Sequence, residues 1–237
     1  MLKKPWVLAL LAGLIVLLAA FALPLLRMAG GGAGADPASA AAGLPWQVRL
    51  LPDGHTEVFG VVPGRDTLAD TEARFGDQLQ VALVARLGET GVLEALVEPF
   101  VAGFVAGRLV LAFDADANAL ARWRDQSGTS QPMDGGLRRF TLNPAGRDEA
   151  RRARLVGLSF VPGVRLSEPD VRQRFGAPAE MLAQPGGAQV LLYPVIGLSA
   201  TVAEGQRGVL QYVAPAEFAA RLRAPLVAAQ VVPAGTR

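Results

Sequence analysis

The sequence predicts an α+β fold: one N-terminal transmembrane helix, then two tandem modules that each combine a helix with an antiparallel meander. Three observations predict it. An uncharged apolar stretch covers residues 6–26, the motif Val-Pro-Gly…Arg-Phe-Gly occurs twice, and short apolar runs bounded by Gly and Pro follow each copy. The expected parts are an anchor over 1–28, a flexible linker over 29–45, a first module over 46–140, a second module over 141–224 and a C-terminal tail over 225–237.

The first element is a membrane anchor over residues 6–26. About 20 apolar residues span a bilayer as a helix. A cleavable signal peptide has a shorter apolar core of about 7–15 residues, although the Ala-Ser-Ala sequence at 38–40 leaves cleavage open as an alternative. Lys3 and Lys4 precede the stretch and should stay in the cytoplasm under the positive-inside rule. We therefore expect a single-pass protein of the bacterial inner membrane, held through residues 6–26, with its C-terminal domain in the periplasm.

The anchor is followed by a linker, and the charge balance of the remaining chain argues against nucleic acid as a partner. Residues 29–45 are rich in Gly and Ala without periodicity, which is typical of a flexible tether.

Of the 23 basic residues, Lys3, Lys4 and Arg27 belong to the anchor, which leaves 20 against 21 acidic residues. A nucleic-acid-binding domain carries a basic excess, so we expect no nucleic acid as a partner. The absence of cysteine fits an exported protein that relies on its core rather than on disulfides.

Each copy of the repeat predicts the start of one helix. Thr67 and Ser167 are the expected N-caps, because a hydroxyl oxygen can accept the free amides of the first turn. Asp70 and Asp170 follow three residues later, in a short version of the capping box near the positive end of the helix.

The repeat also predicts where these helices end. Phe75 and Phe175 should close each helix on its buried side, at equivalent positions. Gly76 and Gly176 suit the left-handed residue that follows a helix.

The segments after each helix predict antiparallel strands. β-branched and apolar runs bounded by Gly and Pro are typical of hairpins, although the Ala/Leu-rich run 79–87 could instead be helical. The expected strands cover 79–87, 92–100 and 107–116 in the first module, and 179–184, 188–194, 197–204 and 208–215 in the second. Further helices are expected at 118–126 and at 144–156, the latter with Asp148 placed to pair with Arg152.

The second copy of the repeat resembles a known module. Its pattern of a glycine, a hydroxyl cap, a short helix and a final Gly-x-Pro consists of Gly163, Ser167, Asp170, Val171, Phe175, Gly176 and Pro178. This pattern resembles the small lipoprotein of the outer-membrane β-barrel assembly machinery, and the β-lactamase inhibitor protein with its two tandem copies. The chain departs from these lipoproteins in having no cysteine, and its first copy has Asp77 after the glycine and no proline. The resemblance implies a non-catalytic binding scaffold whose concave sheet face contacts another protein.

No residue pattern predicts a catalytic, cofactor-binding or metal site. His55, the single histidine, lies in the polar sequence Asp-Gly-His-Thr-Glu, which is typical of a solvated loop. Asp114 and Asp116 could bind a hard cation, but Asx residues after a strand commonly form turns. Glu94 and Glu98 share one strand face roughly 13 Å apart. This separation exceeds that of paired glycosidase carboxylates, so we expect a solvent-facing pair.

Arginines and aromatic residues form the remaining candidate features. One local excess of basic residues consists of Arg138, Arg139, Arg147, Arg151, Arg152 and Arg154. These arginines could contact anionic lipid or an acidic partner. Alternatively, they belong to a solvated helix that is partly balanced by Asp148 and Glu149. Core packing rather than a ligand cage is expected for Trp123, Tyr193, Tyr212 and Phe218. The Gly-Phe-Val-Ala-Gly sequence at 103–107 has the form of a membrane dimer motif but lies outside the apolar stretch, so we expect a loop.

These features favour a membrane-anchored periplasmic binding or adaptor protein without catalytic activity, which engages a protein partner. The alternative is an envelope enzyme, a hydrolase of cell wall or lipid, that gathers carboxylates from both modules. A deep pocket with two carboxylates would favour the enzyme, and an open apolar sheet face would favour binding.

Overall fold

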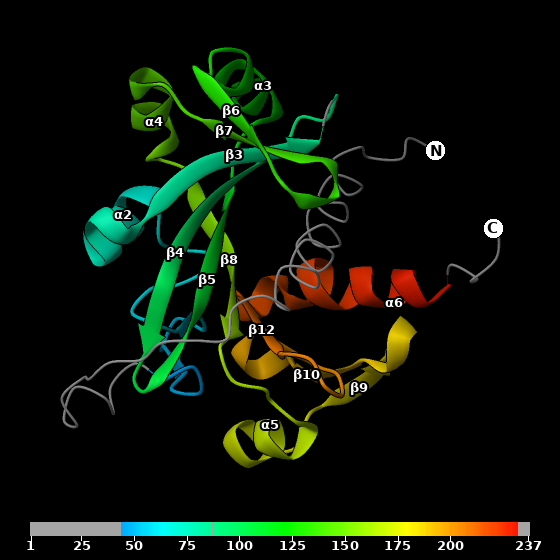
Figure 1. Ribbon diagram of the computed structural model, residues 1–237. Coiled ribbons are helices and arrows are strands. Elements are labelled where there is room, and N and C mark those ends of the chain that lie inside the picture. Colours follow the sequence, from blue (N-terminus) through cyan, green and yellow to red (C-terminus); the bar gives the residue numbers. More distant parts are fainter. Residues whose placement is uncertain (1–43, 87, 232–237) are drawn as a thin grey trace, which may run out of the picture. The chain divides into compact units, whose positions relative to one another are not determined.

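The computed structural model describes residues 44–86 and 88–231, which form an α+β fold with a large antiparallel sheet and several helices (Figure 1). Its strands are β1 (Arg49–Leu50), β2 (Thr56–Glu57), β3 (Gln80–Arg86), β4 (Val92–Ala102), β5 (Val105–Asp114), β6 (Thr129–Pro132), β7 (Leu137–Thr141), β8 (Arg154–Pro162), β9 (Glu180–Ala183), β10 (Gln189–Tyr193), β11 (Leu198–Val202) and β12 (Val209–Val213). Its α-helices are α2 (Leu68–Phe75), α3 (Ala117–Asp125), α4 (Pro144–Ala150), α5 (Glu168–Phe175) and α6 (Ala224–Val231).

The expected anchor over 6–26 and nearly all of the linker over 29–45 lie outside the described residues. Within 44–86 and 88–231 no helix has the length and apolar character needed to cross a membrane.

Strands β1 and β2 form a small hairpin, and the other strands hydrogen-bond in the order β6-β7-β3-β4-β5-β8-β12-β11-β10-β9. Neighbours pair antiparallel, as where Leu83 of β3 lies opposite Leu93 of β4, and where Ala200 of β11 lies opposite Leu210 of β12. The predicted strand over 79–87 is thus confirmed as β3, and its helical alternative is wrong.

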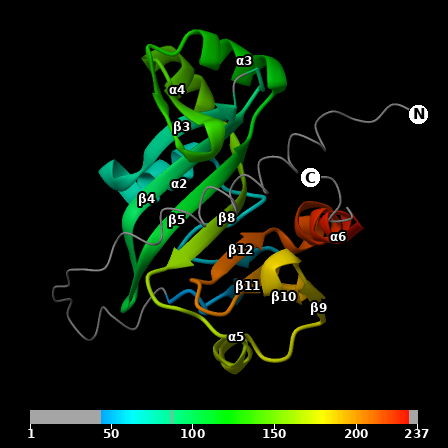
Figure 2. The same cartoon turned by 45° about the vertical axis from the view of Figure 1, so that its right-hand side comes forward.

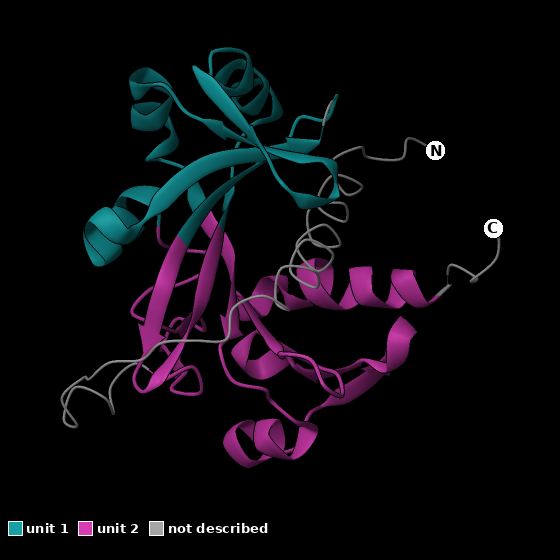
Figure 3. Cartoon of the chain, in the orientation of Figure 1, with its two compact units in different colours: residues 1–34, 67–96, 112–154 teal, residues 35–66, 97–111, 155–237 magenta. Residues whose placement is uncertain are grey.

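The described chain divides into two compact units made of interleaved segments (Figure 3). Unit 1 contains residues 67–96 and 112–154, and unit 2 contains residues 44–66, 97–111 and 155–231. Strands β4, β5 and β8 contribute residues to both units. The module boundaries 46–140 and 141–224 stay a prediction.

The capping boxes predicted from the repeat are confirmed. The hydroxyls of Thr67 and Ser167 accept the amides of Asp70 and Asp170, and each aspartate accepts the amide of its N-cap residue, at 2.8 Å and 2.9 Å. Each helix therefore begins at the predicted residue, because the cap uses only groups within one turn.

The helix ends differ from the prediction in two ways. Gly76 has φ 56° and ψ −138°, and Gly176 has φ 81° and ψ −163°. Both have the positive φ of a C-terminal glycine, but their ψ values lie outside the left-handed helical region, in a region that essentially only glycine adopts. Phe75 is 8% exposed, as predicted, whereas Phe175 is only half-buried against Tyr193, with ring centroids 5.8 Å apart. The predicted equivalence of the two phenylalanines is therefore wrong.

In unit 1, contacts between side chains hold three helices together. The buried face of α2 consists of Leu68, Thr71 and Phe75, with the spacing of one helix face. Glu72 on the other side of this helix pairs with Arg147 at 2.7 Å and Arg151 at 3.1 Å, which ties α2 to α4.

Trp123 joins α3 to α4 in the same unit. Its indole is buried, and Nε1 donates a hydrogen bond to Oε2 of Glu149 at 2.9 Å. The predicted core position of this tryptophan is thus confirmed, and the hydrogen bond satisfies the polar edge of the ring.

In unit 2, the C-terminal helical segment packs on the strands β9 to β12, as the views of Figures 1 and 2 both show. This segment consists of a π-helix (Ala219–Arg223) that continues into α6. Its core with the sheet is apolar and consists of Leu182, Val190, Leu192, Val213, Phe218, Leu222 and Leu226. The expected tail over 225–237 therefore begins inside a packed helix, because the Leu side chains of its first turns have a sheet face to cover.

A cluster of four buried rings lies elsewhere in unit 2. Phe59 contacts Phe100, Phe160 and Tyr212, with centroid separations of 5.1, 5.3 and 6.1 Å. Phe59 and Gly60 have φ of 57° and 79° and join Val58 to Val61 in a two-residue hairpin turn. This turn normally prefers Asn or Gly. We infer that burial of the ring in the cluster offsets the backbone strain of about 1–3 kcal/mol.

The helix predicted over 144–156 is confirmed only in its first half. Helix α4 ends at Ala150, and β8 begins at Arg154. Every residue of β8 after Arg154 is buried, so the strand has no polar alternation that the sequence pattern could show. Strands β6 and β7 were also not predicted, because their polar residues do not resemble a buried strand.

Candidate binding surface

An exposed apolar surface gathers at one end of unit 2. We call it the hairpin-tip surface and define it by Trp46, Val101, Phe104 and Val164. Phe104 is 67% exposed, Val101 56% and Val164 54%. Large apolar side chains exposed together mark interaction sites more often than isolated ones do.

The β4–β5 hairpin positions the first part of this surface. Gly103, with φ 63°, forms the turn together with Phe104, and the flanking Ala102 and Val105 are buried. Because both flanking side chains are fixed in the interior, the turn holds the Phe104 ring outside. The Gly-Phe-Val-Ala-Gly sequence at 103–107 is therefore a hairpin turn and the start of β5 rather than only a loop.

A backbone contact places Val164 beside the same hairpin. The amide of Gly163 donates to the carbonyl of Ala106 at 2.7 Å. A Cβ at Gly163 would lie 3.0 Å from that carbonyl oxygen, so only glycine allows this approach without a shift.

Trp46 connects the hairpin to α5. Its ring centroid lies 6.0 Å from that of Phe104, and the guanidinium carbon of Arg174 lies 3.6 Å from the centroid of the indole. The chain beside Trp46 is fixed, because the hydroxyl of Tyr212, which is fully buried, donates to the carbonyl of Pro45 at 2.6 Å. The Arg174 guanidinium thus stacks on Trp46, and the Phe104 ring contacts the same indole at an interplanar angle of 59°. The chain at Pro45 anchors this group.

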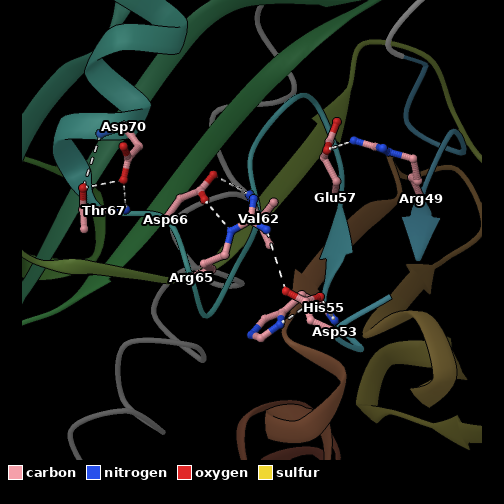
Figure 4. Close-up of polar contacts among 9 residues, drawn as sticks. All are labelled: Arg49, Asp53, His55, Glu57, Val62, Arg65, Asp66, Thr67 and Asp70. Carbon is pink, nitrogen blue, oxygen red and sulfur yellow. Dashed lines mark hydrogen bonds and ion pairs between the residues drawn. The ribbon is translucent and has the colours of Figure 1, made fainter. Parts of the chain in front are cut away.

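His55 belongs to a polar turn in unit 2 (Figure 4). Oδ1 of Asp53 accepts the amide of His55 at 3.1 Å and lies 3.3 Å from its Nδ1. The hydrogen bond from the His55 amide holds the pKa of Asp53 below its usual value. Arg65 lies 3.8 Å from Asp53 and 3.3 Å from Asp66, which in turn accepts the amide of Val62 at 2.8 Å. The histidine is half-buried rather than solvated, which corrects the expectation, and its contacts organise a turn.

Glu94 differs from the solvent-facing residue that the sequence predicted, whereas Glu98 agrees with it. Glu98 is exposed and pairs with Arg108 at 2.7 Å. Glu94 is half-buried on β4, opposite Ala82 of β3, and in the described part of the chain no cation or donor contacts its carboxylate. Burial raises the pKa of Glu94 to about 7.

This shift predicts a pH dependence of stability. Between pH of about 4.5 and about 7 the folded chain holds a proton on Glu94 that the unfolded chain has lost. The free energy of unfolding should therefore fall as pH rises through this window, by at most about 3 kcal/mol, and should be independent of Glu94 above it. Chemical denaturation of the full chain in micelles at pH 5 and pH 8 measures the difference. Glu94→Gln should remove most of it, and an unchanged pH dependence in this variant would contradict the assignment.

The aspartates at the end of β5 are bound by protein groups. Asp114 lies 3.5 Å from Arg154, and Asp116 is the N-cap of α3, whose side chain accepts the amides of Asn118 and Ala119. The sequence predicted a turn here, whereas the chain passes from β5 directly to the N-cap of α3. Across 44–86 and 88–231, no group of three or more His, Cys, Asp or Glu side chains comes together as a possible metal site.

The basic bias of the sequence is spread over β7, α4 and β8 in unit 1, and most of its members have partners. Arg147 and Arg151 pair with Glu72, and Arg154 with Asp114. Arg138 donates to Ser130 and Arg139 to Gln80. No contact is seen for the predicted Asp148–Arg152 pair in the described residues, and the balanced, solvated interpretation is the better one.

The remaining aromatic candidates pack in the core, as predicted. Tyr193, Tyr212 and Phe218 are at most 6% exposed, and the hydroxyl of Tyr193 donates to the carbonyl of Gly176 at 3.1 Å. The residues of the hairpin-tip surface were not among the sequence candidates. One signal could have found Phe104: a large apolar residue stands in a two-residue turn, where polar or small residues are usual.

Comparisons of the chain with protein-family models, with curated proteins and with solved structures find no match.

Proposed function

We propose that this chain is a membrane-anchored binding or adaptor protein of the bacterial cell envelope, without catalytic activity, that engages a protein partner through the hairpin-tip surface. The observation that carries the proposal is the contact of the exposed Arg174 and Phe104 with the half-buried ring of Trp46 between them. Arginine and aromatic side chains are the residues that dominate the binding energy of protein interfaces.

The contacts of the polar candidates support binding over catalysis. Asp53, Asp66 and Asp116 accept backbone amides, and Glu98 is occupied by Arg108. Groups committed to turns, caps and ion pairs contribute to folding and are poorly placed to transfer protons.

One observation favours the alternative, an envelope hydrolase. A carboxyl group with a pKa near 7, as Glu94 has, suits a general acid. Such an enzyme needs a second carboxylate within reach, and the strand neighbours of Glu94 on its own face are Val92 and Leu96. We therefore prefer the binding protein.

The proposal includes the finer architecture that the sequence predicts: an anchor over 6–26 and two tandem modules of helix and meander. Under it, the segment between Leu26 and Trp46 acts as a tether. A flexible chain of this length has an end-to-end distance of roughly 25 Å. The hairpin-tip surface would therefore stay near the inner membrane and meet partners in or close to it.

Site-specific photo-crosslinking in intact cells tests the function. A photoreactive phenylalanine analogue replaces Phe104, and the same analogue at Ala220, an exposed residue of the π-helix in unit 2, is the control. We expect a covalent adduct with one protein from position 104 and none from position 220. The absence of any protein adduct at position 104 would contradict the proposal. A periplasm-specific reporter fused after Arg237 checks the orientation independently.

A further inference from the structure

Three arginines of unit 2 differ from the others in their electrostatic surroundings. Most arginines of this unit form an ion pair within it: Arg49 with Glu57, Arg65 with Asp66, Arg108 with Glu98, Arg172 with Glu168, Arg221 with Glu217, and Arg223 with Glu180. Within the described residues, Arg165, Arg174 and Arg207 have no such pair. Unpaired cations on an otherwise paired surface leave a local positive potential.

Arg165 and Arg174 border the hairpin-tip surface, and the turn that carries Arg207 lies beside Leu166 of the same segment. Arg165 follows Val164 directly, and Arg174 covers the Trp46 ring. Arg207 precedes Gly208, which packs on Leu166: a Cβ at Gly208 would lie 3.1 Å from the Cβ of Leu166. The segment from Gly163 through α5 thus brings the positive and the apolar side chains together.

Nearby carboxylates neutralise this surface only in part. Asp170 accepts the hydroxyl and the amide of Ser167, and these hydrogen bonds, together with the nearby charge of Arg174, hold its pKa below the usual value. Glu168 pairs with Arg172. Glu204 is exposed in the turn before Arg207 and, in the described part of unit 2, has no ion pair. Within the described residues, three arginines without an ion pair therefore stand against two carboxylates without one, Asp170 and Glu204, which leaves an excess of one positive charge.

The stacked guanidinium keeps its hydrogen-bonding capacity. The N–H groups of arginine point outward in the plane of the guanidinium, so stacking on Trp46 leaves them available to a carboxylate. The stack is also preorganised, because the Tyr212–Pro45 hydrogen bond fixes the chain beside the indole. Preorganisation reduces the entropy lost on binding.

We propose, on the basis of the binding function above, that the partner presents an acidic and apolar protein segment: carboxylates for Arg165, Arg174 and Arg207, next to aliphatic or aromatic side chains for Trp46 and Phe104. An anionic bilayer offers similar chemistry. The fixed Arg174–Trp46–Phe104 group favours a partner of defined shape, because fluid headgroups do not require one geometry.

Charge reversal combined with crosslinking from position 104 tests this inference in the full chain. Arg174→Glu and Arg165→Glu should each lower the yield of the protein adduct at least tenfold, because like charges would then face each other. Arg174→Lys keeps the charge but loses the planar stack, and should give an intermediate yield. Arg152→Glu is the matched control, since Arg152 is an exposed arginine of unit 1 outside the surface, and its yield should be unchanged.

Mass spectrometry of the adduct identifies the partner segment, and a charge swap completes the test. Reversing an Asp or Glu of that segment to Arg should restore the adduct with the Arg174→Glu chain. A protein adduct that is insensitive to both reversals would overturn the acidic segment and leave the binding function standing. An adduct with phospholipid alone would overturn both, in favour of a membrane-docking surface. Melting temperatures of the variants, compared with the parent chain, exclude misfolding as the cause of a lost adduct.

Discussion

Replacing Gly197 with alanine should destabilise the chain by at least about 4 kcal/mol. Gly197 has φ 69°, and an added Cβ would lie 2.0 Å from the carbonyl oxygen of Val213. That oxygen belongs to the backbone of β12, and the amide of the same residue donates to the carbonyl of Gly197 at 3.0 Å. The clash therefore cannot be relieved by a side-chain rotation and must displace a strand. Thermal unfolding of the full chain in micelles, together with protease resistance, measures the loss.

Gly205→Ala is the matched control for this substitution. Gly205 has nearly the same φ, 71°, but no atom lies within 4 Å of the position of an added Cβ. The free energy of unfolding of this control should fall by only about 1 kcal/mol, which is the cost of placing a non-glycine residue at positive φ. If the two variants are equally stable, close packing against Val213 does not limit position 197.

The parts of the fold that the sequence predicted correctly depend on local chemistry. The N-caps at Thr67 and Ser167 use a hydroxyl, an amide and a carboxylate within four residues, so the motif alone specifies the geometry. The β9–β10 hairpin was found because turn residues separate two runs of strand-forming residues.

The parts that were missed depend on distant partners. Strand β8 carries no alternation because both of its faces are covered by other elements. The helix over 224–231 is stable because Leu222 and Leu226 cover a sheet face formed by Val190 and Leu192. Phe175 repeats the sequence position of Phe75, but burial is set by the surroundings, and at Phe175 these leave part of the ring in solvent.

The candidate binding surface was also missed, because it too depends on contacts between residues that are distant in the sequence. Arg174 and Trp46 are far apart in the sequence, and neither belongs to a motif that indicates their contact. Arg165 and Arg207 have no ion pair among the described residues, and this is likewise a property of the folded chain. Among the polar candidates, the sequence correctly predicted the exposure of Glu98 but not the half-buried positions of His55 and Glu94, which depend on distant parts of the chain.

Phe160→Ala should be the second severe substitution, with a loss of about 3–5 kcal/mol of unfolding free energy. The side chain is completely buried, and its ring lies 5.3 Å from that of Phe59 and 5.9 Å from that of Phe100. Truncation removes the ring contacts and leaves a cavity that Phe59 cannot fill readily, because its backbone conformation is fixed by the turn with Gly60. Denaturant unfolding of the full chain in micelles should show the loss.

Phe175→Ala provides the comparison within the same unit and for the same chemical change. Its ring is half-buried and has one aromatic neighbour, Tyr193, so the expected loss is only about 1–2 kcal/mol. Equal losses at the two positions would mean that the ring cluster around Phe59 contributes no more than an ordinary surface contact. The strained turn at Phe59 would then lack the compensation inferred for it. A much larger loss of unfolding free energy at Phe160 would show that the four-ring cluster stabilises the turn at Phe59 and Gly60. It would then also stabilise the segment that leads from Trp46 into the rest of unit 2.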